Sequence, residues 1–163
     1  MSAPSPLASA RQRPAPGPYF SPLTALLTPR SVAIVGASGT PGKIGAIPVA
    51  MLREYGFPGE VFPVNPKAQE ISGYRAVPEL AAIGAPLDLA IVAIPAAGVL
   101  ETLETCASLG TRAAVVFSSG FAEIGEDGVV AQAAMADLAR RTGMRILGPN
   151  TLGVANINAG LVA

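Results

Sequence analysis

Four glycines at every third position mark the segment of this sequence that could bind a phosphate. They follow the apolar run 32–35 and are Gly36, Gly39, Gly42 and Gly45. Because glycine lacks a Cβ atom, the backbone can turn sharply there and come close to a ligand. Ser38, Thr40 and Lys43 add hydroxyl and ammonium donors. If a helix follows, its first amides are unpaired and lie at the positive end of its dipole, which favours a pyrophosphate. The spacing differs from the strict G-x-G-x-x-G of dinucleotide enzymes.

A lysine stands where NAD-binding domains usually carry an acid. Asn65, Pro66 and Lys67 follow the second apolar run, residues 60–64. In NAD-binding domains a carboxylate at this place takes the ribose hydroxyls. A cation there favours a nucleotide with a phosphate on its ribose, which means NADP or coenzyme A (CoA), and Lys43 adds a second cation. NADP also needs a reductase partner surface, for which the chain has no room, whereas CoA needs only a crevice. The alternative is that Lys67 is an ordinary solvated lysine.

The composition excludes several classes of function. The chain has 163 residues, of which 50% are hydrophobic and 13% charged, which favours one domain with most of its elements buried. Lys plus Arg and Asp plus Glu both number 11, so a nucleic-acid-binding surface is not expected. The absence of histidine rules out Ser-His-Asp and Cys-His catalysis and imidazole metal ligation in this chain. The one cysteine, Cys106, permits neither a disulfide framework nor a zinc site, and we expect it to be a buried core residue. We also expect the chain to bind no metal and the protein to be cytoplasmic. No apolar run is long enough to span a membrane.

Strands and helices alternate along the chain and position these residues. Strands are predicted at 32–35, 60–64, 87–94, 111–117 and 145–147, and helices at 44–55, from 77, 97–109 and 129–142. Residues 23–27 are expected to make one helical turn against the sheet edge, and residues 71–76 a short irregular piece. Because no Asn-Gly hairpin signal separates the strands, right-handed crossovers predict an α/β fold with a Rossmann-like, doubly wound parallel sheet. The single domain spans 23–163, after a proline-rich leader, 1–22, that we expect to be disordered.

The predicted loops converge on one crevice. Each follows the carboxyl end of a strand, the edge at which open α/β sheets bind ligands; they are residues 36–43, 65–67, 94–96, 118–121 and 148–150. Among the acidic residues, Glu126 and Asp127 are expected in a solvated loop, with Glu123 the best candidate for another role. Asp88 is expected to be a cap or turn residue. Tyr74 and Arg75 either approach an adenine or a ribose phosphate, or belong to a plain surface loop.

Five segments closely resemble the CoA-binding domain of the NDP-forming acyl-CoA synthetases. These are the ADP-forming acetate–CoA ligases, relatives of the succinyl-CoA synthetase α subunit; the same domain occurs in some Pat-type protein acetyltransferases. The segments are residues 32–38, 61–67, 88–95, 118–123 and 148–153, and the resemblance covers about residues 23–163. Where the family commonly has Cys, this chain has Thr151, a near-isosteric change.

The resemblance implies a reaction in three steps. ATP phosphorylates a histidine, the phosphate passes to a carboxylic acid, and the CoA thiol attacks the acyl phosphate. The histidine and the ATP-grasp module lie in domains that this chain lacks, so it is expected to bind CoA and to hold no catalytic residue. ATP and Mg are implied only for the full-length enzyme. The implied partners are the phosphohistidine and ATP-grasp domains or subunit, in an oligomer.

The resemblance also implies where CoA lies. The pyrophosphate region is assigned to the glycine-rich loop, at Gly36, Ser38, Gly39, Gly42, Lys43 and Gly45. The adenosine and 3′-phosphate end is assigned to Asn65, Pro66 and Lys67, with Ile94 and Pro95 flanking the nucleotide. The pantetheine and thiol end is assigned to Ser118, Ser119, Gly120 and Asn150. Two alternatives to a ligase remain: a stand-alone CoA-sensing module, and the CoA-binding part of a Pat-type acetyltransferase. We expect the chain to be a fragment of a longer protein, whose downstream sequence would separate the three.

Overall fold

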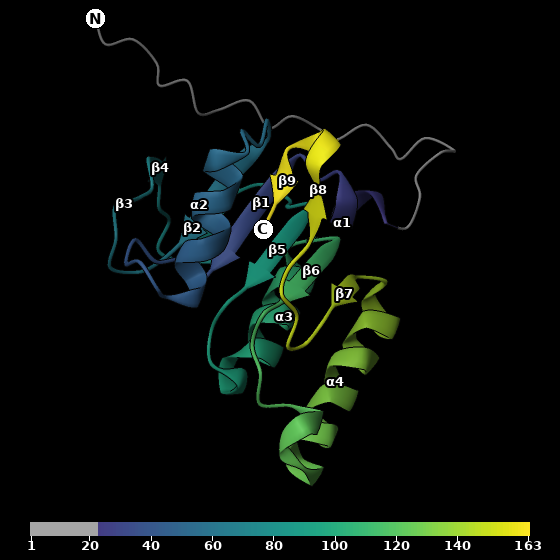
Figure 1. The fold of residues 1–163 in the computed structure, drawn as a ribbon. Coiled ribbons are helices and arrows are strands. Elements are labelled where there is room, and N and C mark those ends of the chain that lie inside the picture. Colours follow the sequence, from purple (N-terminus) through teal and green to yellow (C-terminus); the bar gives the residue numbers. More distant parts are fainter. Residues whose placement is uncertain (1–22) are drawn as a thin grey trace, which may run out of the picture.

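A five-stranded parallel sheet runs through the centre of the computed structural model, which describes residues 23–163 (Figure 1). Its strands are β1 (Ser31–Val35), β2 (Glu60–Val64), β5 (Leu89–Val92), β6 (Ala113–Val116) and β7 (Arg145–Leu147). Their order is β2-β1-β5-β6-β7, so the direction of winding reverses between β1 and β5. The predicted Rossmann-like, doubly wound α/β fold is confirmed. The predicted disordered leader, 1–22, lies outside the described residues.

Both faces of the sheet are buried, because the central strands β1, β5 and β6 carry apolar side chains at every position after Ser31 at the start of β1. In β1, Val32 and Ile34 belong to one apolar layer and Ala33 to the other. The same alternation divides β5 and β6, as expected for side chains that point to opposite faces of a strand. The centre of the sheet therefore has no solvated face, and its polar groups are concentrated at the two ends of the strands.

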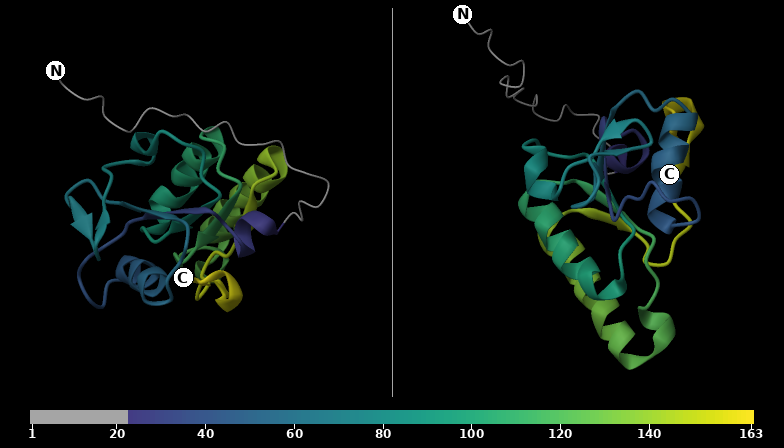
Figure 2. Two further views of the ribbon diagram at one scale, coloured as in Figure 1. Left: turned by 90° about the horizontal axis from the view of Figure 1, so that it is seen from above. Right: turned by 90° about the vertical axis from the view of Figure 1, so that its left-hand side faces the viewer.

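Helices cover the two faces, and Figure 2 shows the layers. One face is covered by α2 (Ile47–Glu54), which follows a 3₁₀ turn, η1 (Ile44–Ala46). The other is covered by α3 (Val99–Ser108) and α4 (Glu126–Thr142). The other 3₁₀ turns are η2 (Leu80–Ile83), η3 (Ala96–Gly98), η4 (Ala122–Ile124) and η5 (Ile157–Ala159). Among these helices of residues 23–163, none combines the length and the apolar character that crossing a bilayer requires.

Helices differ from the sequence-based expectation in three places. The helix predicted from residue 77 is the 3₁₀ turn η2, which begins at Leu80. The last helix begins at Glu126 rather than at residue 129, so Glu126 and Asp127 lie in its first turn and not in a loop. Acidic side chains are favourable there because they face the positive end of the helix dipole. The first helix, α1 (Thr24–Leu27), was expected at the edge of the sheet. It contacts β6, the strand next to the edge strand β7.

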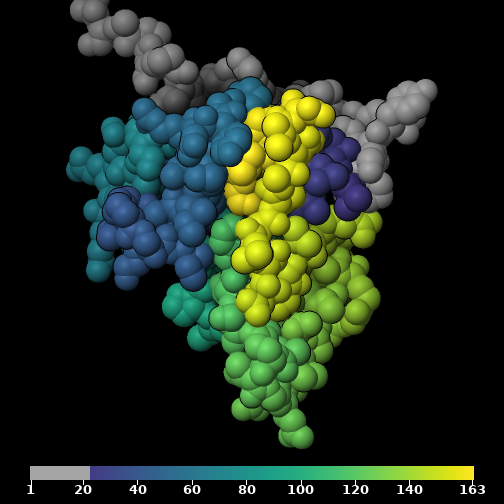
Figure 3. Space-filling view, viewed as in Figure 1, coloured from purple at the N-terminus to yellow at the C-terminus, as the bar shows by residue number. Residues whose placement is uncertain are grey.

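Two short antiparallel hairpins correct the expectation of a chain without hairpins. The segment expected to be irregular contains β3 (Glu70–Ile71) and β4 (Tyr74–Arg75), and β8 (Ala155–Asn156) pairs with β9 (Leu161–Val162) near the end of the chain. In the first hairpin the turn is Ser72-Gly73, and both residues have positive φ. Such two-residue turns match the twist of the strands. The second hairpin packs beside α2, as Figure 3 shows for the C-terminal segment.

Candidate functional site

Hydrogen bonds join the loops at the carboxyl edge of the sheet into two groups, the loops after β1 and β2 and the loops after β5, β6 and β7. The Asn65 side-chain amide after β2 donates to the Ala37 carbonyl after β1, at 2.8 Å. The Ser118 hydroxyl after β6 donates to the Ile94 carbonyl after β5, at 2.5 Å. The Asn150 backbone amide after β7 donates to the Ser118 carbonyl, at 2.9 Å. The structure therefore brings the five predicted loops to one edge.

The loops after β1 and β5 meet at the point where the winding reverses. Gly36 has φ +83°, and a Cβ atom there would lie 2.4 Å from the Ala93 carbonyl oxygen. A Cβ at Gly45 would lie 1.9 Å from the Gly36 carbonyl oxygen, and the Gly45 carbonyl accepts a hydrogen bond from the Ser38 amide at 3.1 Å. These two glycines are needed for the loop to close on its neighbours, which is a packing role.

The outer part of the same loop is open to solvent. Gly39 and Gly42 are exposed, no atom lies within 4 Å of a Cβ built on either, and their amides make no hydrogen bond within residues 23–163. The Ser38 hydroxyl accepts a hydrogen bond from the Thr40 amide at 3.0 Å and so shapes the turn. Lys43 is exposed immediately before η1. Free amides and an ammonium group on a glycine-rich loop are suited to a pyrophosphate.

The Asn65 side chain organises the turn after β2. Its Oδ1 accepts hydrogen bonds from the amides of Lys67 at 2.8 Å and Ala68 at 3.1 Å, while its Nδ2 is bound to the loop after β1. All these contacts are internal, so the side chain holds the turn in place. Pro66 and Lys67 are exposed beside it and are available to a ligand.

A hollow of about 650 Å³ lies between this turn and the β3–β4 hairpin. Its lining residues are Asn65, Pro66, Ala68, Gln69, Glu70, Arg75, Ala76 and Pro78. Two predicted site residues, Asn65 and Pro66, are among them. The missed β3–β4 hairpin supplies Glu70 and Arg75, and the Ser-Gly pair at its turn is the sequence signal that could have revealed it.

The loop after β6 is held by Glu123. The Glu123 carboxylate accepts hydrogen bonds from the amides of Gly120 at 2.6 Å and Phe121 at 3.2 Å. The Gly120 hydrogen bond is the largest cause that holds the pKa of Glu123 below its ordinary value. Ser118 is buried with its hydroxyl bound to Ile94, whereas Ser119 is exposed. Of the residues assigned to the thiol end in this loop, Ser119 therefore has the accessible side chain.

The remaining predicted site residues lie on the same edge. Ile94, in the loop after β5, is half-buried with its side chain near Gly36 of the loop after β1, and Pro95 is exposed just before η3. Asn150 is exposed, with φ +54°. Their placement beside the Ser118 loop agrees with the expectation that these loops meet.

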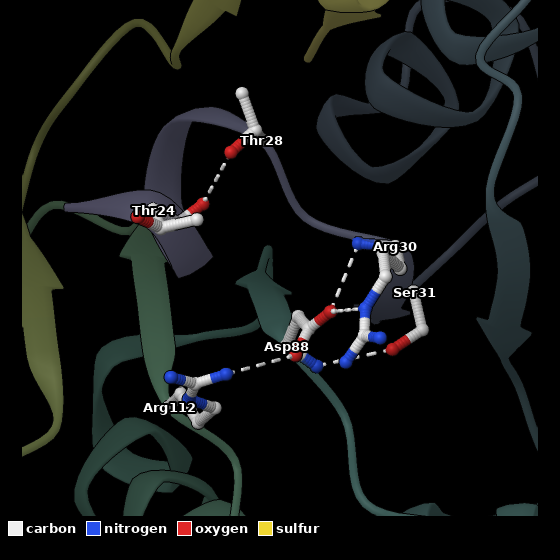
Figure 4. Close-up of polar contacts among 6 residues, drawn as sticks. All are labelled: Thr24, Thr28, Arg30, Ser31, Asp88 and Arg112. Carbon is white, nitrogen blue, oxygen red and sulfur yellow. Dashed lines mark hydrogen bonds and ion pairs between the residues drawn. The ribbon is translucent and has the colours of Figure 1, made fainter. Parts of the chain in front are cut away.

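The opposite edge of the sheet carries a charged cluster with a structural role (Figure 4). The buried Asp88 carboxylate accepts hydrogen bonds from the Arg30 backbone amide at 2.9 Å and side chain at 3.4 Å, and Arg112 lies 3.7 Å away. The Asp88 amide donates to the Ser31 hydroxyl at 3.0 Å. These contacts link the amino ends of the three neighbouring strands β1, β5 and β6. The candidate site lies at the other, carboxyl ends of the strands.

The single cysteine of the sequence is inert. Cys106 is fully buried in α3, and this burial raises the pKa of its thiol to about 11. The thiol is therefore protonated at neutral pH and is not a nucleophile. In residues 23–163, no three His, Cys, Asp or Glu side chains are grouped so as to hold a metal ion.

A doubly wound sheet with a glycine-rich loop at its switch point defines a nucleotide-binding α/β domain. Comparison with known families identifies the nucleotide: residues 30–157 match the CoA binding domain family, and the chain belongs to that family.

Similar proteins agree with this assignment. Acetate–CoA ligase [ADP-forming] II of Archaeoglobus fulgidus is 42% identical over 137 residues, which are 84% of this chain and 20% of that protein. The α subunit of acetate–CoA ligase [ADP-forming] I of Pyrococcus furiosus is 41% identical over 145 residues, or 86% of this chain and 31% of that subunit. The solved structure of the dinucleotide-forming acetyl-coenzyme A synthetase 1 of Ca. Korarchaeum cryptofilum has a TM-score of 0.80 at 37% identity, covering 85% of this chain and 30% of that one. The chain thus spans between a fifth and a third of the length of these relatives.

Proposed function

We propose that this chain is the CoA-binding part of an ADP-forming acyl-CoA ligase, which makes acyl-CoA from a carboxylic acid, ATP and CoA. The observation that carries the proposal is that the family match over residues 30–157 includes all five loops of the carboxyl edge. The relatives above are ligases of this kind. We further propose that the complete protein is a cytoplasmic oligomer that uses ATP and Mg²⁺ in its other parts.

In this proposal the edge binds CoA along its length. The free amides of Gly39 and Gly42 and the Lys43 ammonium group hold the pyrophosphate, because unpaired N–H groups and a cation stabilise its negative charge. Pro66 and Lys67 contact the adenosine and its 3′-phosphate, beside the hollow after β2. Ile94 and Pro95 flank the nucleotide between the two.

The thiol end of CoA lies at the loops after β6 and β7, next to Ser119 and Asn150. The chain contains no histidine, so the phosphohistidine of the proposed reaction belongs to another part of the protein. What this domain contributes is binding and orientation: it fixes the thiol where an acyl phosphate can be presented to it. ADP, phosphate and acyl-CoA are then the products of the complete ligase.

Isothermal titration of the chain with CoA, dephospho-CoA, NAD and NADP tests the proposal. We expect CoA to bind most tightly and dephospho-CoA more weakly, because Lys67 loses its phosphate partner. A preference for NADP, or no binding of CoA, would refute the assignment. In the complete protein, formation of ADP from ATP that depends on both CoA and a carboxylic acid would identify a ligase, whereas CoA binding without such turnover for any of a panel of carboxylic acids would indicate a sensor or an acetyltransferase.

A further inference from the structure

The β3–β4 hairpin has one buried face and one solvent-facing face. Its register pairs Ile71 with Tyr74 and Glu70 with Arg75. Ile71 is buried and Tyr74 packs against the same apolar cluster. Because side chains alternate along a strand, Glu70 and Arg75 lie together on the other face, where both line the hollow.

The hairpin is held firmly in this orientation. The Arg53 guanidinium of α2 donates to the Ser72 carbonyl at the turn. At the open end, the Val77 amide donates to the Pro63 carbonyl of β2 and the Asn65 amide donates to the Val77 carbonyl, both at 2.9 Å. The hairpin is thus fixed beside the turn that carries Pro66 and Lys67, and Arg75 lines the hollow between them.

Arg75 has the properties of a phosphate-binding residue. It is exposed and forms no ion pair within residues 23–163, not even with Glu70 across the hairpin. Arg75 is the one cation among the residues that line the hollow, beside one carboxylate, Glu70, and the exposed Lys67 lies between two lining residues, Pro66 and Ala68. The hollow has a volume within the range of about 300–1,000 Å³ that is usual for small-molecule sites. A guanidinium group binds a phosphate through two parallel hydrogen bonds, which an ammonium group does not do.

We infer that Arg75 binds the 3′-phosphate of CoA in this hollow together with Lys67 and strengthens the preference for CoA over dephospho-CoA. The inference rests on the proposed function, since it takes CoA as the ligand. It adds to the assigned adenosine end a residue from a different element, and it makes the β3–β4 hairpin part of the site.

The test compares Arg75→Gln with Arg145→Gln, an exposed arginine at the start of β7 and hence at the opposite edge of the sheet. Isothermal titration measures the dissociation constants for CoA and dephospho-CoA, and thermal unfolding checks that each variant is folded. We expect Arg75→Gln to weaken CoA about ten-fold, as for the loss of a charge-assisted hydrogen bond, and to change dephospho-CoA less than about two-fold. Arg75→Lys should recover part of the loss, and Arg145→Gln should bind both ligands as the parent chain does.

The outcomes separate this inference from the proposed function. If the parent chain binds no CoA, both fail. If the parent chain prefers CoA to dephospho-CoA and Arg75→Gln leaves the ratio of the two affinities unchanged, Arg75 does not bind the phosphate, while the CoA-binding function stands. Equal weakening of both ligands by Arg75→Gln would also overturn the inference, because it would show a general effect on the site. Should Arg75→Gln fail to fold, Arg75→Lys must still lower the ratio of the two affinities, and an unchanged ratio would refute the inference.

Discussion

Several side chains on the carboxyl edge bind other loops rather than being free for a ligand. Ser118 donates its hydroxyl to Ile94, and Asn65 uses both ends of its amide to hold its own turn against the loop after β1. Glu123 occupies the amide of Gly120. Each of these residues affects ligand binding indirectly, because it holds neighbouring residues in place. Lys43, Lys67, Arg75, Ser119 and Asn150 are exposed and are candidates for direct contact.

Glu123 makes the order of the loop after β6 dependent on pH. Its pKa is lowered chiefly by the Gly120 hydrogen bond, so the fold favours the ionised carboxylate. The contribution of this contact is present above the ordinary pKa of a glutamate and is lost as the pH falls through the lowered value. In an NMR titration, the Gly120 amide resonance should therefore move with an apparent pKa below the ordinary range. This transition should vanish in Glu123→Gln, and its persistence there would assign it to another group.

At the scale of elements, the glycine-rich loop contains some glycines that are needed for packing and others that are free to contact a ligand. Gly45→Ala would place a Cβ 1.9 Å from the Gly36 carbonyl oxygen, whereas at Gly39 the same change meets no atom within 4 Å. We expect Gly45→Ala to lower the midpoint of urea unfolding and to weaken CoA, because the loop must move. Gly39→Ala should leave the midpoint unchanged and weaken CoA alone, if the ligand approaches the backbone there. Equal midpoints for the two variants would contradict this division.

The sequence predicted the elements that have a clear apolar pattern, and missed those that do not. Strands 60–64 and 145–147 have the predicted bounds, while the strand predicted at 87–94 pairs only over Leu89–Val92, because Pro95 and the loop after it leave the sheet. The hairpin strands have two residues each, too few for any alternation to be read. The convergence of the site loops followed from the winding rule. The roles of Asn65 and Ser118 could not be predicted, because their partners are 28 and 24 residues away in the chain.

At the scale of the whole molecule, the two edges of the sheet serve different purposes. The Asp88 cluster links the amino ends of the strands, and the loops that bind the ligand lie at the carboxyl ends. Asp88→Asn should therefore lower the free energy of unfolding by about 2 kcal/mol, the order expected for charge-assisted hydrogen bonds. The CoA dissociation constant of the folded variant should stay within about two-fold of the parent value. Urea unfolding and isothermal titration measure the two quantities, and a large loss of affinity in a folded Asp88→Asn would place this cluster in the site.

The carboxyl edge also determines how long a ligand must be to contact the loops at both of its ends. Neighbouring strands are about 4.8 Å apart, so the four gaps between β2 and β7 separate the Asn65 turn from the Asn150 turn by about 19 Å. Hydrogen bonds link the loops after β1 and β2, and also those after β5, β6 and β7, and the paired strands connect the two groups. A ligand must therefore be long enough to reach from one end to the other, and a CoA analogue with a shortened pantetheine arm would keep its adenosine contacts while its thiol fell short of the loops after β6 and β7.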